Sequence, residues 1–409
     1  MTAAQPATPR EFDLVVFGAT GFTGRLVAEV MARHGGGQGL RWALAGRSRA
    51  RLQALAAELG LPTGHPLIEA DAGDASALRA LAACTRAVIT TVGPYQRGGE
   101  PLVQACIAAG THYLDLCGEP AWMAAMIRRH DAEARARGAR IVFSCGFDSV
   151  PFDLGVLALQ HLARSRTGQP LAEVQSRVLV MKGGFSGGTA ASLLATLEAV
   201  GRDPQAARDM ADPFALVPGF SGPPQPMPEA ATHDNFLGQW SAPFVMAPIN
   251  TKNVHRTHAL LGHPWGSGFV YGERMACGAG LDGELRARGL ARQERLQARV
   301  LGLRLGRALV RRFALPQPGE GPDEASREAG RYEIHVSGEG VDGRRHALRV
   351  TGQRDPGYGA TSRVIVACAR TLLKGPERAG GLTTPGATLG LDALPELERL
   401  AELRFVPEA

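Results

Sequence analysis

Residues 13–25 read DLVVFGATGFTGR, an apolar run that leads into three glycines at a spacing of three. The run predicts a buried strand, and the FTGRLVAEVMARH that follows predicts a helix. Glycine lets the backbone turn tightly and approach a diphosphate, and a helix N-terminus offers free N–H groups with a partial positive charge. A tight turn without a ligand is the alternative. We expect a dinucleotide-binding loop made by Gly18, Thr20, Gly21, Phe22, Thr23 and Gly24.

The first half of the chain repeats this strand–helix unit. Six short runs rich in Val, Ile and Leu alternate with Ala-rich helical stretches. Strands that are apolar throughout are typical of a parallel sheet buried on both faces, and right-handed crossovers then give a doubly wound α/β domain. We therefore expect a Rossmann-type domain over residues 1–160, with strands at 13–18, 41–46, 66–71, 86–92, 111–116 and 139–145.

The pattern changes in the second half. Residues 331–339 and 345–352 alternate like strands and flank a Val-Asp-Gly turn, which is a hairpin signal. Residues 361–375 predict a helix that ends at a Gly-Pro pair. Strands followed by helices indicate an α+β domain with an antiparallel sheet. We expect this substrate and dimerisation domain over residues 161–375.

Gly46-Arg47-Ser48 ends the second predicted strand, where many NAD-dependent enzymes carry an acidic residue. A carboxylate there bonds the ribose 2′-hydroxyl, whereas an arginine pairs with a 2′-phosphate. The sequence therefore predicts NADP(H), with Ser48 also capping the next helix; a solvated strand-end arginine is the alternative. Residues at the ends of the third and fourth strands are expected to contact the adenine, ribose and nicotinamide of the cofactor. They are Asp71, Thr91, Val92, Gly93 and Pro94. The alternative is that these residues form plain helix caps or turns.

Catalytic groups are expected beyond the carboxyl ends of the strands, where ligands bind in such folds. Asp115 follows the fifth strand and Asp148 the sixth, each close to a glycine. Lys182, one of three lysines, precedes a second glycine-rich helix entry at residues 183–188, and Tyr271 is a weaker candidate. We expect Asp148, Asp115 or Lys182 to deliver a proton. A helix cap, a structural salt bridge and an exposed strand-end lysine are the respective alternatives.

Composition excludes several classes of protein. The net charge of +6 comes from one segment, because residues 284–313 hold nine Arg and two Glu, so a nucleic-acid-binding role is not indicated. The six cysteines lack a C-x-x-C pair, so we expect no metal and reduced core thiols. His255, His258 and His263 lie in a stretch rich in Pro and Gly and are expected on a polar surface loop. No apolar run is long enough to span a membrane and no signal peptide is visible, which predicts a cytoplasmic protein.

Several motifs, in this order, resemble those of the saccharopine dehydrogenase-like oxidoreductases, and within them the bacterial branch called trans-acting enoyl reductases. They are GATGFTG, LAGRS, TTVGPY, YLDLCGE, CGFDSVPFD, SGGTAAS and GGLTTPGATLG. The resemblance covers most of the chain. It implies an NADP-binding domain, a substrate domain on an antiparallel sheet, and a C-terminal segment over residues 376–409 that returns to the first domain. The Gly-Phe-Asp-Ser run around Asp148 departs from the Gly-Leu-Asp-Pro of true saccharopine reductases, which argues against saccharopine as the substrate.

The resemblance further implies an NADPH-dependent reductase of an activated C=C bond in a lipid or polyketide precursor, with a small-molecule or carrier-bound acyl substrate. A C=N reductase of the saccharopine type and a non-catalytic dinucleotide-binding protein are the alternatives. The basic segment 284–313 places Arg292, Arg295 and Arg299 on one helical face, and on another it places Leu296, Val300, Leu303 and Val310. We favour a helix docked on the core with a solvated arginine face. Contact with an anionic membrane or an acidic carrier is the alternative. For the protein as a whole, a homodimer is left open.

Overall fold

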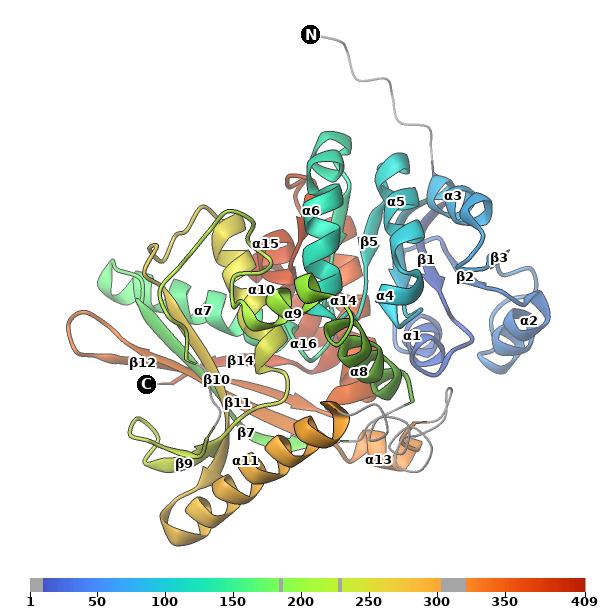
Figure 1. Ribbon diagram of the computed structural model, residues 1–409. Coiled ribbons are helices and arrows are strands. Elements are labelled where there is room, and N and C mark those ends of the chain that lie inside the picture. The colour runs from blue at the N-terminus through green and yellow to red at the C-terminus, as the bar shows by residue number, and fades with distance from the viewer. Residues whose placement is uncertain (1–9, 184–186, 227–229, 303–320, 409) are drawn as a thin grey trace.

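The computed structural model describes residues 10–183, 187–226, 230–302 and 321–408. Two seven-stranded sheets make up its framework. Figure 1 shows the first sheet at the right of the molecule and the second at the lower left, with helices between them. The strands of the first sheet come from the first half of the chain and from one C-terminal strand, so the molecule is built as the α/β and α+β combination expected from its sequence.

All strands of the first sheet are parallel, in the order β13-β6-β5-β4-β1-β2-β3. Successive residues of β1 face opposite sides, so Leu14 and Val16 join one core cluster while Val15 and Phe17 join the other. This two-sided burial confirms the Rossmann-type prediction. The strands are β1 (Phe12–Phe17), β2 (Trp42–Gly46), β3 (Leu67–Glu69), β4 (Thr85–Thr90), β5 (His112–Leu114), β6 (Arg140–Val142) and β13 (Gly381–Thr383).

Helices cover both faces of this sheet. One group follows the strands in sequence: α1 (Phe22–Arg33), α2 (Arg49–Glu58), α3 (Ala75–Cys84), α4 (Tyr95–Gly98), α5 (Glu100–Ala109) and α6 (Pro120–Arg137). A second group comes from the far end of the chain: α14 (Thr361–Lys374), α15 (Pro385–Leu389), the 3₁₀ turn η2 (Gly390–Ala393) and α16 (Leu394–Ala401). Helix α14, which precedes the expected boundary at residue 375, packs against α1 and β4 of the first domain.

The second sheet has the order β14-β12-β11-β7-β10-β9-β8. Its neighbours are antiparallel except for β7 and β10, which run parallel, so the expectation of a purely antiparallel sheet is wrong at this one pair. The hairpin expected around Val341-Asp342-Gly343 is present as β11 and β12. The strands are β7 (Glu173–Lys182), β8 (Thr232–Asp234), β9 (Gln239–Ala242), β10 (Val270–Gly278), β11 (Arg331–Glu339), β12 (Arg345–Gln353) and β14 (Arg404–Pro407).

Two helices join the sheets. Helix α7 (Val150–Thr167) packs against β11 and β12, and α10 (Ala247–Leu260) contacts β10 of the second sheet and β13 of the first. The C-terminal segment contributes a strand to each sheet, because β13 pairs with β6 and β14 with β12. The remaining elements are α8 (Gly187–Val200), α9 (Pro204–Ala211), α11 (Gly280–Gly302), α13 (Glu324–Glu328) and the π-helical turn η1 (Pro356–Ala360).

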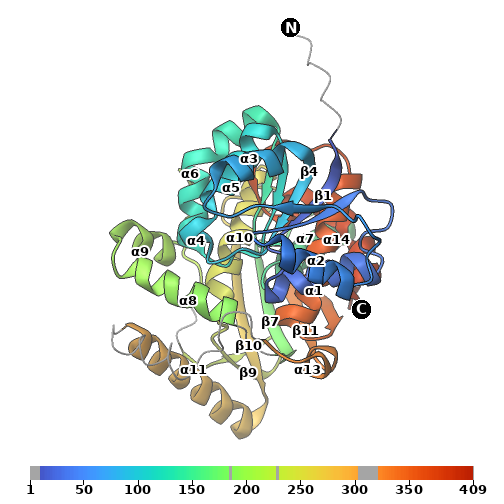
Figure 2. The same ribbon diagram turned by 90° about the vertical axis from the view of Figure 1, so that its right-hand side faces the viewer.

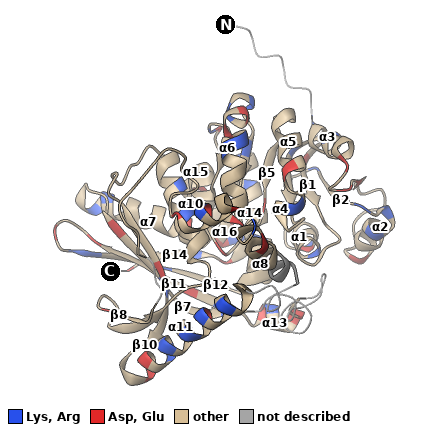
Figure 3. Ribbon diagram, in the orientation of Figure 1, with Lys and Arg blue, Asp and Glu red and all other residues tan. Residues whose placement is uncertain are grey.

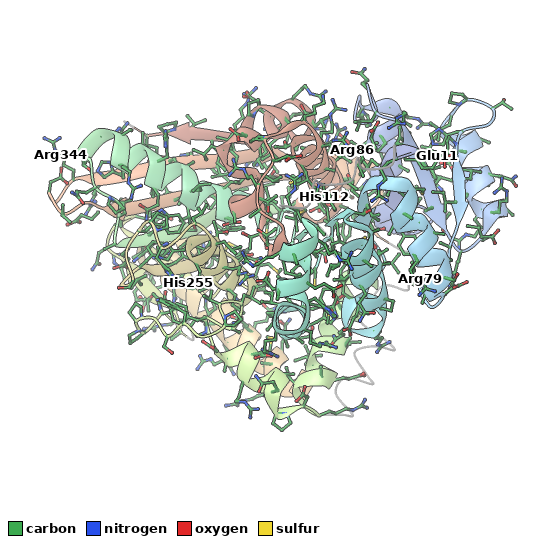
Figure 4. The ribbon with its side chains drawn as sticks, turned by 90° about the horizontal axis from the view of Figure 1, so that it is seen from above. Glu11, Arg79, Arg86, His112, His255 and Arg344 are labelled. Atoms are coloured by element: carbon green, nitrogen blue, oxygen red, sulfur yellow. The ribbon has the colours of Figure 1, made fainter. Side chains whose placement is uncertain are left out.

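The histidine cluster is not a polar surface loop, so that prediction is wrong. His255 and His258 lie on α10 and are 2% exposed, and Figure 4 labels His255 among the packed side chains of this helix. Trp265 stacks on His258 with ring centroids 4.7 Å apart. Burial lowers the pKa of His255 to about 3 and that of His258 to about 4, so both side chains are neutral at pH 7.

The basic segment is a helix over its described part and docks on β9 and β10 with its arginines exposed, which agrees with the favoured interpretation. The leucines do not make this contact. The buried residues of α11 are Gly283, Ala287 and Ala291, whereas Leu296 is 62% exposed and Val300 is 37% exposed. Small residues allow close approach to β9 and β10, and this contact leaves the larger apolar side chains outside. Leu303 and Val310 lie outside the described residues.

Candidate functional site

The predicted phosphate loop has the geometry that a diphosphate requires. Gly18 ends β1 with φ +85°, a conformation that L side chains rarely adopt. A Cβ added to Gly24 would lie 2.0 Å from the carbonyl oxygen of Gly18, so the first turn of α1 lies directly against the end of β1. Helix α1 has no side-chain cap at Gly21. Its N-terminal amides are thus not covered by a side-chain oxygen and are available to an anion.

The other residues of this loop contribute differently. The Phe22 ring meets the Tyr358 ring edge-on at 5.2 Å, so the side chain packs on η1 of the second domain and only its backbone N–H can serve a phosphate. The Thr20 carbonyl accepts a hydrogen bond from Arg51 at 3.1 Å. Thr23 is half-buried in the first turn of α1. The structure therefore places all six predicted loop residues together, with Phe22 also acting as a contact between the domains.

The end of β2 presents a free guanidinium beside this loop. Arg47 is exposed and makes no hydrogen bond or ion pair among the described residues, while Gly46 is buried beneath it. Ser48 accepts a hydrogen bond from the Arg51 amide at 3.4 Å and so caps α2, as predicted. Arg51 is a residue that sequence reasoning missed. Its signal was the third arginine of RSRAR, which places another cation within reach of Thr20.

The fourth strand reaches the same edge of the sheet. Thr91 donates a hydrogen bond to the Gly18 carbonyl at 3.4 Å, and a Cβ on Gly18 would come within 2.7 Å of a Val92 methyl carbon. Gly93 is exposed and Pro94 begins α4. Asp71 is exposed at the end of β3, where it accepts a hydrogen bond from the Gly73 amide at 2.8 Å. The Asp71 side chain thus shapes its own turn.

Glu119 supports the loop after Pro94, although we did not predict it as a site residue. Its carboxylate accepts hydrogen bonds from the amides of Tyr95 at 3.0 Å and Gln96 at 2.9 Å. A side-chain hydrogen bond also links it to Ser192 of α8. Burial raises the pKa of Glu119 even though these hydrogen bonds oppose the shift. The YLDLCGE motif contained this residue, but only the fold shows which amides it binds.

Asp115 lies beneath the carboxyl edge rather than at its surface. It is completely buried and accepts hydrogen bonds from the Tyr113 hydroxyl, the Cys117 amide and the Ser144 amide. Burial raises the pKa of Asp115 to about 7, against the lowering effect of these bonds. Ser144 adopts φ +59°, which is uncommon for a residue other than glycine. The Asp115 carboxyl thus fastens the ends of β5 and β6 together and is sealed from a substrate.

Asp148 is the predicted carboxyl group that solvent reaches. It follows β6 at the start of the turn into α7. Crowding by protein atoms and the neighbouring Asp355 carboxylate raise the pKa of Asp148 above its usual range. Asp355 is buried and accepts a hydrogen bond from the Tyr358 amide at 2.7 Å. Sequence reasoning missed Asp355, because Asp-Pro-Gly in this stretch is also an ordinary turn pattern.

The end of β7 joins this group. A Cβ added to Gly183 would lie 2.1 Å from an Asp355 oxygen, so the β7 end touches the loop that faces Asp148. Lys182, the preceding residue, is exposed and has no hydrogen bond or ion pair within the described part of the chain. Residues 184–186 of the second glycine-rich entry lie outside the described residues. Tyr271 is fully buried and therefore does not reach this surface.

These residues fit NADP. The uncapped helix and the close approach at Gly24 suit a diphosphate, and the unpaired Arg47 suits a 2′-phosphate. A Rossmann sheet with this loop, facing a second domain that carries exposed polar groups, defines a dinucleotide-dependent oxidoreductase.

Comparison with known proteins agrees with this class. Residues 14–142 match the model of the saccharopine dehydrogenase NADP binding domain. A putative trans-acting enoyl reductase of Mycobacterium tuberculosis is 43% identical over 96% of both chains, and the trans-acting enoyl reductase of Mycobacterium bovis is 36% identical over 94% of this chain and 95% of the relative. The chain belongs to the trans-acting enoyl reductase family of saccharopine dehydrogenase-like proteins. It is an NADP-dependent oxidoreductase.

Solved structures agree on the fold. The apo saccharopine dehydrogenase of Saccharomyces cerevisiae superposes with a TM-score of 0.51 and 14% identity, covering 97% of this chain and 100% of that one. At this identity the likeness concerns architecture alone. It confirms the arrangement of a nucleotide domain with a second sheet domain that we expected from the sequence.

Proposed function

We propose that the protein reduces the C=C bond of an α,β-unsaturated acyl thioester, with Asp148 as the proton donor. The relatives named enoyl reductase support this choice of bond. NADPH, when bound, supplies the hydride for the β-carbon, and one proton added at the α-carbon completes the saturated product. The observation that carries the proposal is an exposed carboxyl with a raised pKa at the carboxyl edge that also holds the cofactor loop.

Each polar group of the site has a distinct task in this scheme. The amides of the first turn of α1 hold the diphosphate, and Arg47 pairs with the 2′-phosphate. Crowding by protein atoms and the adjacent Asp355 carboxylate raise the pKa of Asp148 to about 6, so a larger fraction of this carboxyl is protonated near neutral pH than for an ordinary aspartate. Lys182 is our candidate for holding the thioester carbonyl, since it is exposed near this carboxyl pair and has no described partner. Asp115 holds the ends of β5 and β6 in register.

The state of the cysteine thiols indicates the cellular compartment of the reaction. All six cysteines are free and five of them are buried. Unpaired thiols are typical of reducing compartments. We therefore place the reaction in the cytoplasm, with a small-molecule or carrier-bound acyl thioester as the substrate.

The test uses the crotonyl thioester of coenzyme A as the probe. We expect NADPH oxidation with wild-type protein, and with 4-deuterated NADPH we expect the label at the β-carbon of the product. Asp148→Asn should lower kcat by about 100-fold, the usual contribution of a general acid, while leaving the NADPH Kd unchanged.

The matched control is Glu69→Gln, which removes an exposed carboxyl at the end of β3 that has no role in the scheme. It should leave kcat within about twofold of wild type. An unchanged kcat in Asp148→Asn would remove Asp148 from its role. Tight NADPH binding without turnover of crotonyl or longer enoyl thioesters would overturn the reductase proposal and favour a dinucleotide-binding protein.

A further inference from the structure

Helix α11 carries an unusual concentration of exposed apolar side chains. Ten large apolar side chains are exposed among the described residues, and five of them are on this helix of 23 residues. Leu281 is 69% exposed, Leu285 58% and Leu296 62%. Single exposed leucines are ordinary, but a group on one element marks an interaction surface.

Four of these five side chains form one stripe, while Leu290 lies apart from it, next to the buried row of the helix. At about 100° per residue, Leu281, Leu285, Leu296 and Val300 fall within an arc of about 100°. The buried row of the helix, which includes Ala287 and Ala291, lies on roughly the opposite side. The stripe therefore points directly away from the sheet, along about 28 Å of helix. Figure 2 shows α11 at the lower left of the molecule, beside β9.

Arginines border the stripe. By the same helical geometry Arg288 and Arg295 follow one side of the stripe and Arg286 lies on the other, while Arg292 and Arg299 lie just inside its edge on the side of Arg288. All five are exposed. Figure 3 shows the resulting row of basic residues along α11. Arg288 pairs with Glu284 at 2.6 Å, but Arg292 and Arg299 have no hydrogen bond or ion pair within the described chain. The surface thus combines leucines with unpaired positive charge.

We propose that α11 lies in the surface of a membrane that contains anionic lipids, with the leucine stripe among the acyl chains and the arginines at the headgroups. An apolar stripe with basic borders is the pattern of an interfacial helix. The stripe is a convex ridge, which a deformable lipid surface accommodates along its full length. Within the described residues no helix is long and apolar enough to cross a membrane, so the contact is peripheral.

This contact would bring the lipid surface close to the site. Helix α11 contacts α8, and Ser192 of α8 is hydrogen-bonded to Glu119, which holds the loop after Pro94. A protein seated on α11 would therefore have its cofactor edge one helix away from the membrane. Membrane binding does not depend on the proposed reaction, since it uses none of the residues assigned to it.

The experiment is flotation of the full chain with vesicles of phosphatidylcholine alone or mixed with phosphatidylglycerol in equal parts. We expect binding to the mixed vesicles and little to phosphatidylcholine, with at least a tenfold loss when salt rises from about 50 to about 500 mM, because screening weakens contacts between exposed charges. The double variant Leu285→Gln with Leu296→Gln should lower the partition coefficient at least tenfold. Arg292→Gln with Arg299→Gln should abolish the preference for anionic vesicles.

Matched controls are Val341→Gln with Val406→Gln, which remove two exposed apolar side chains far from α11 and should bind as wild type. NADPH affinity and melting temperature should be unchanged in all variants, which shows that they fold. Absence of flotation at low salt would overturn the proposal, as would undiminished flotation of the leucine variant. A concentration-dependent dimer in sedimentation that the leucine variant abolishes, without vesicle binding, would assign the stripe to a second copy instead.

Discussion

The cofactor edge of the first sheet and the interior of the second domain differ in which groups supply their polar contacts: backbone atoms at the edge and side chains in the interior. At the edge, backbone atoms do most of the work, through Gly18, Gly24 and the uncapped start of α1. In the interior, Glu273 is 1% exposed and accepts hydrogen bonds from Tyr271 at 2.7 Å and Asn250 at 2.9 Å. At the cofactor edge, a side chain added to Gly18 or Gly24 would therefore clash with the backbone or a neighbouring side chain. At the buried Glu273 site, a negative charge is unfavourable.

The interior network also reaches the site. The Asn250 side-chain oxygen accepts a hydrogen bond from the Ser149 hydroxyl at 3.0 Å, and Ser149 directly follows Asp148. Asn253 donates to the same hydroxyl at 2.9 Å. The residue after the proposed proton donor is thus fixed by side chains of α10. The buried amide side chains of Asn250 and Asn253 thus help to position the exposed Asp148 carboxyl.

The largest effect is expected at the backbone-built edge, from Gly24→Ala. The new Cβ would lie 2.0 Å from the Gly18 carbonyl oxygen, so strand end and helix must separate. We expect the free energy of unfolding to fall by about 3 kcal/mol and the NADPH Kd to rise at least about 100-fold. Chemical denaturation and calorimetry measure both. Gly268→Ala, where an added Cβ meets nothing within 4 Å, is the control; equal behaviour of the two variants would contradict a close-packed loop.

A smaller effect is expected where the edge does use a side chain. Arg47→Glu should shift the ratio of NADPH to NADH affinity by about 10- to 100-fold toward NADH, because a charge-assisted hydrogen bond contributes about 1.5–3 kcal/mol. Fluorescence titration with both nucleotides gives the ratio. Arg49→Glu makes the same charge change two residues away and should move the ratio much less. If both variants shift it equally, long-range charge rather than Arg47 sets the preference.

The smallest effect is expected from removing the buried acid with Glu273→Gln. Burial raises the pKa of Glu273 to about 8 from an ordinary value of 4.5, so the folded protein holds a proton that the unfolded chain releases. Wild-type stability should therefore fall as pH rises from about 4.5 to about 8. The variant lacks this titration, and its stability relative to wild type should rise over that range. Thermal melts at pH 5 and 8 test this.

Glu339→Gln, which removes an exposed carboxylate at the end of β11, is the control for this titration. It should leave the pH dependence of wild type unchanged. A Glu273→Gln curve parallel to wild type would show that Glu273 is already ionised in the fold. The Glu273 site would then carry a charge, and the contrast between this site and the cofactor edge would disappear.

The same contrast explains how far the sequence could be interpreted. Glycines at Gly18, Gly21 and Gly24 are required locally, so the loop and the first sheet were predictable from a short stretch. The fold brings β10, α10 and the start of α7 together, and only then do Glu273, Asn250 and Ser149 form hydrogen bonds. Their local sequence does not predict this contact. Strand β13 was missed for a similar reason, since its three residues pair with β6 from the far end of the chain.

Asp148 and α11 illustrate two further limits. Sequence placed Asp148 and Asp115 in equivalent positions after neighbouring strands, but exposure separates them, because Asp115 is sealed by three hydrogen-bond donors. For α11, the periodicity of the sequence identified an apolar face but did not show which face of the helix packs on the sheet. The sheet takes the row of Gly283, Ala287 and Ala291, since small side chains allow closer packing than leucines do.

Residues 381–407 have a consequence for how the molecule is made. They supply β13 to one sheet and β14 to the other. On the ribosome, β6 and β12 therefore lack these neighbours until this part of the chain has been synthesised. Open strand edges invite pairing with other chains. We expect nascent or truncated molecules that lack it to depend heavily on chaperones.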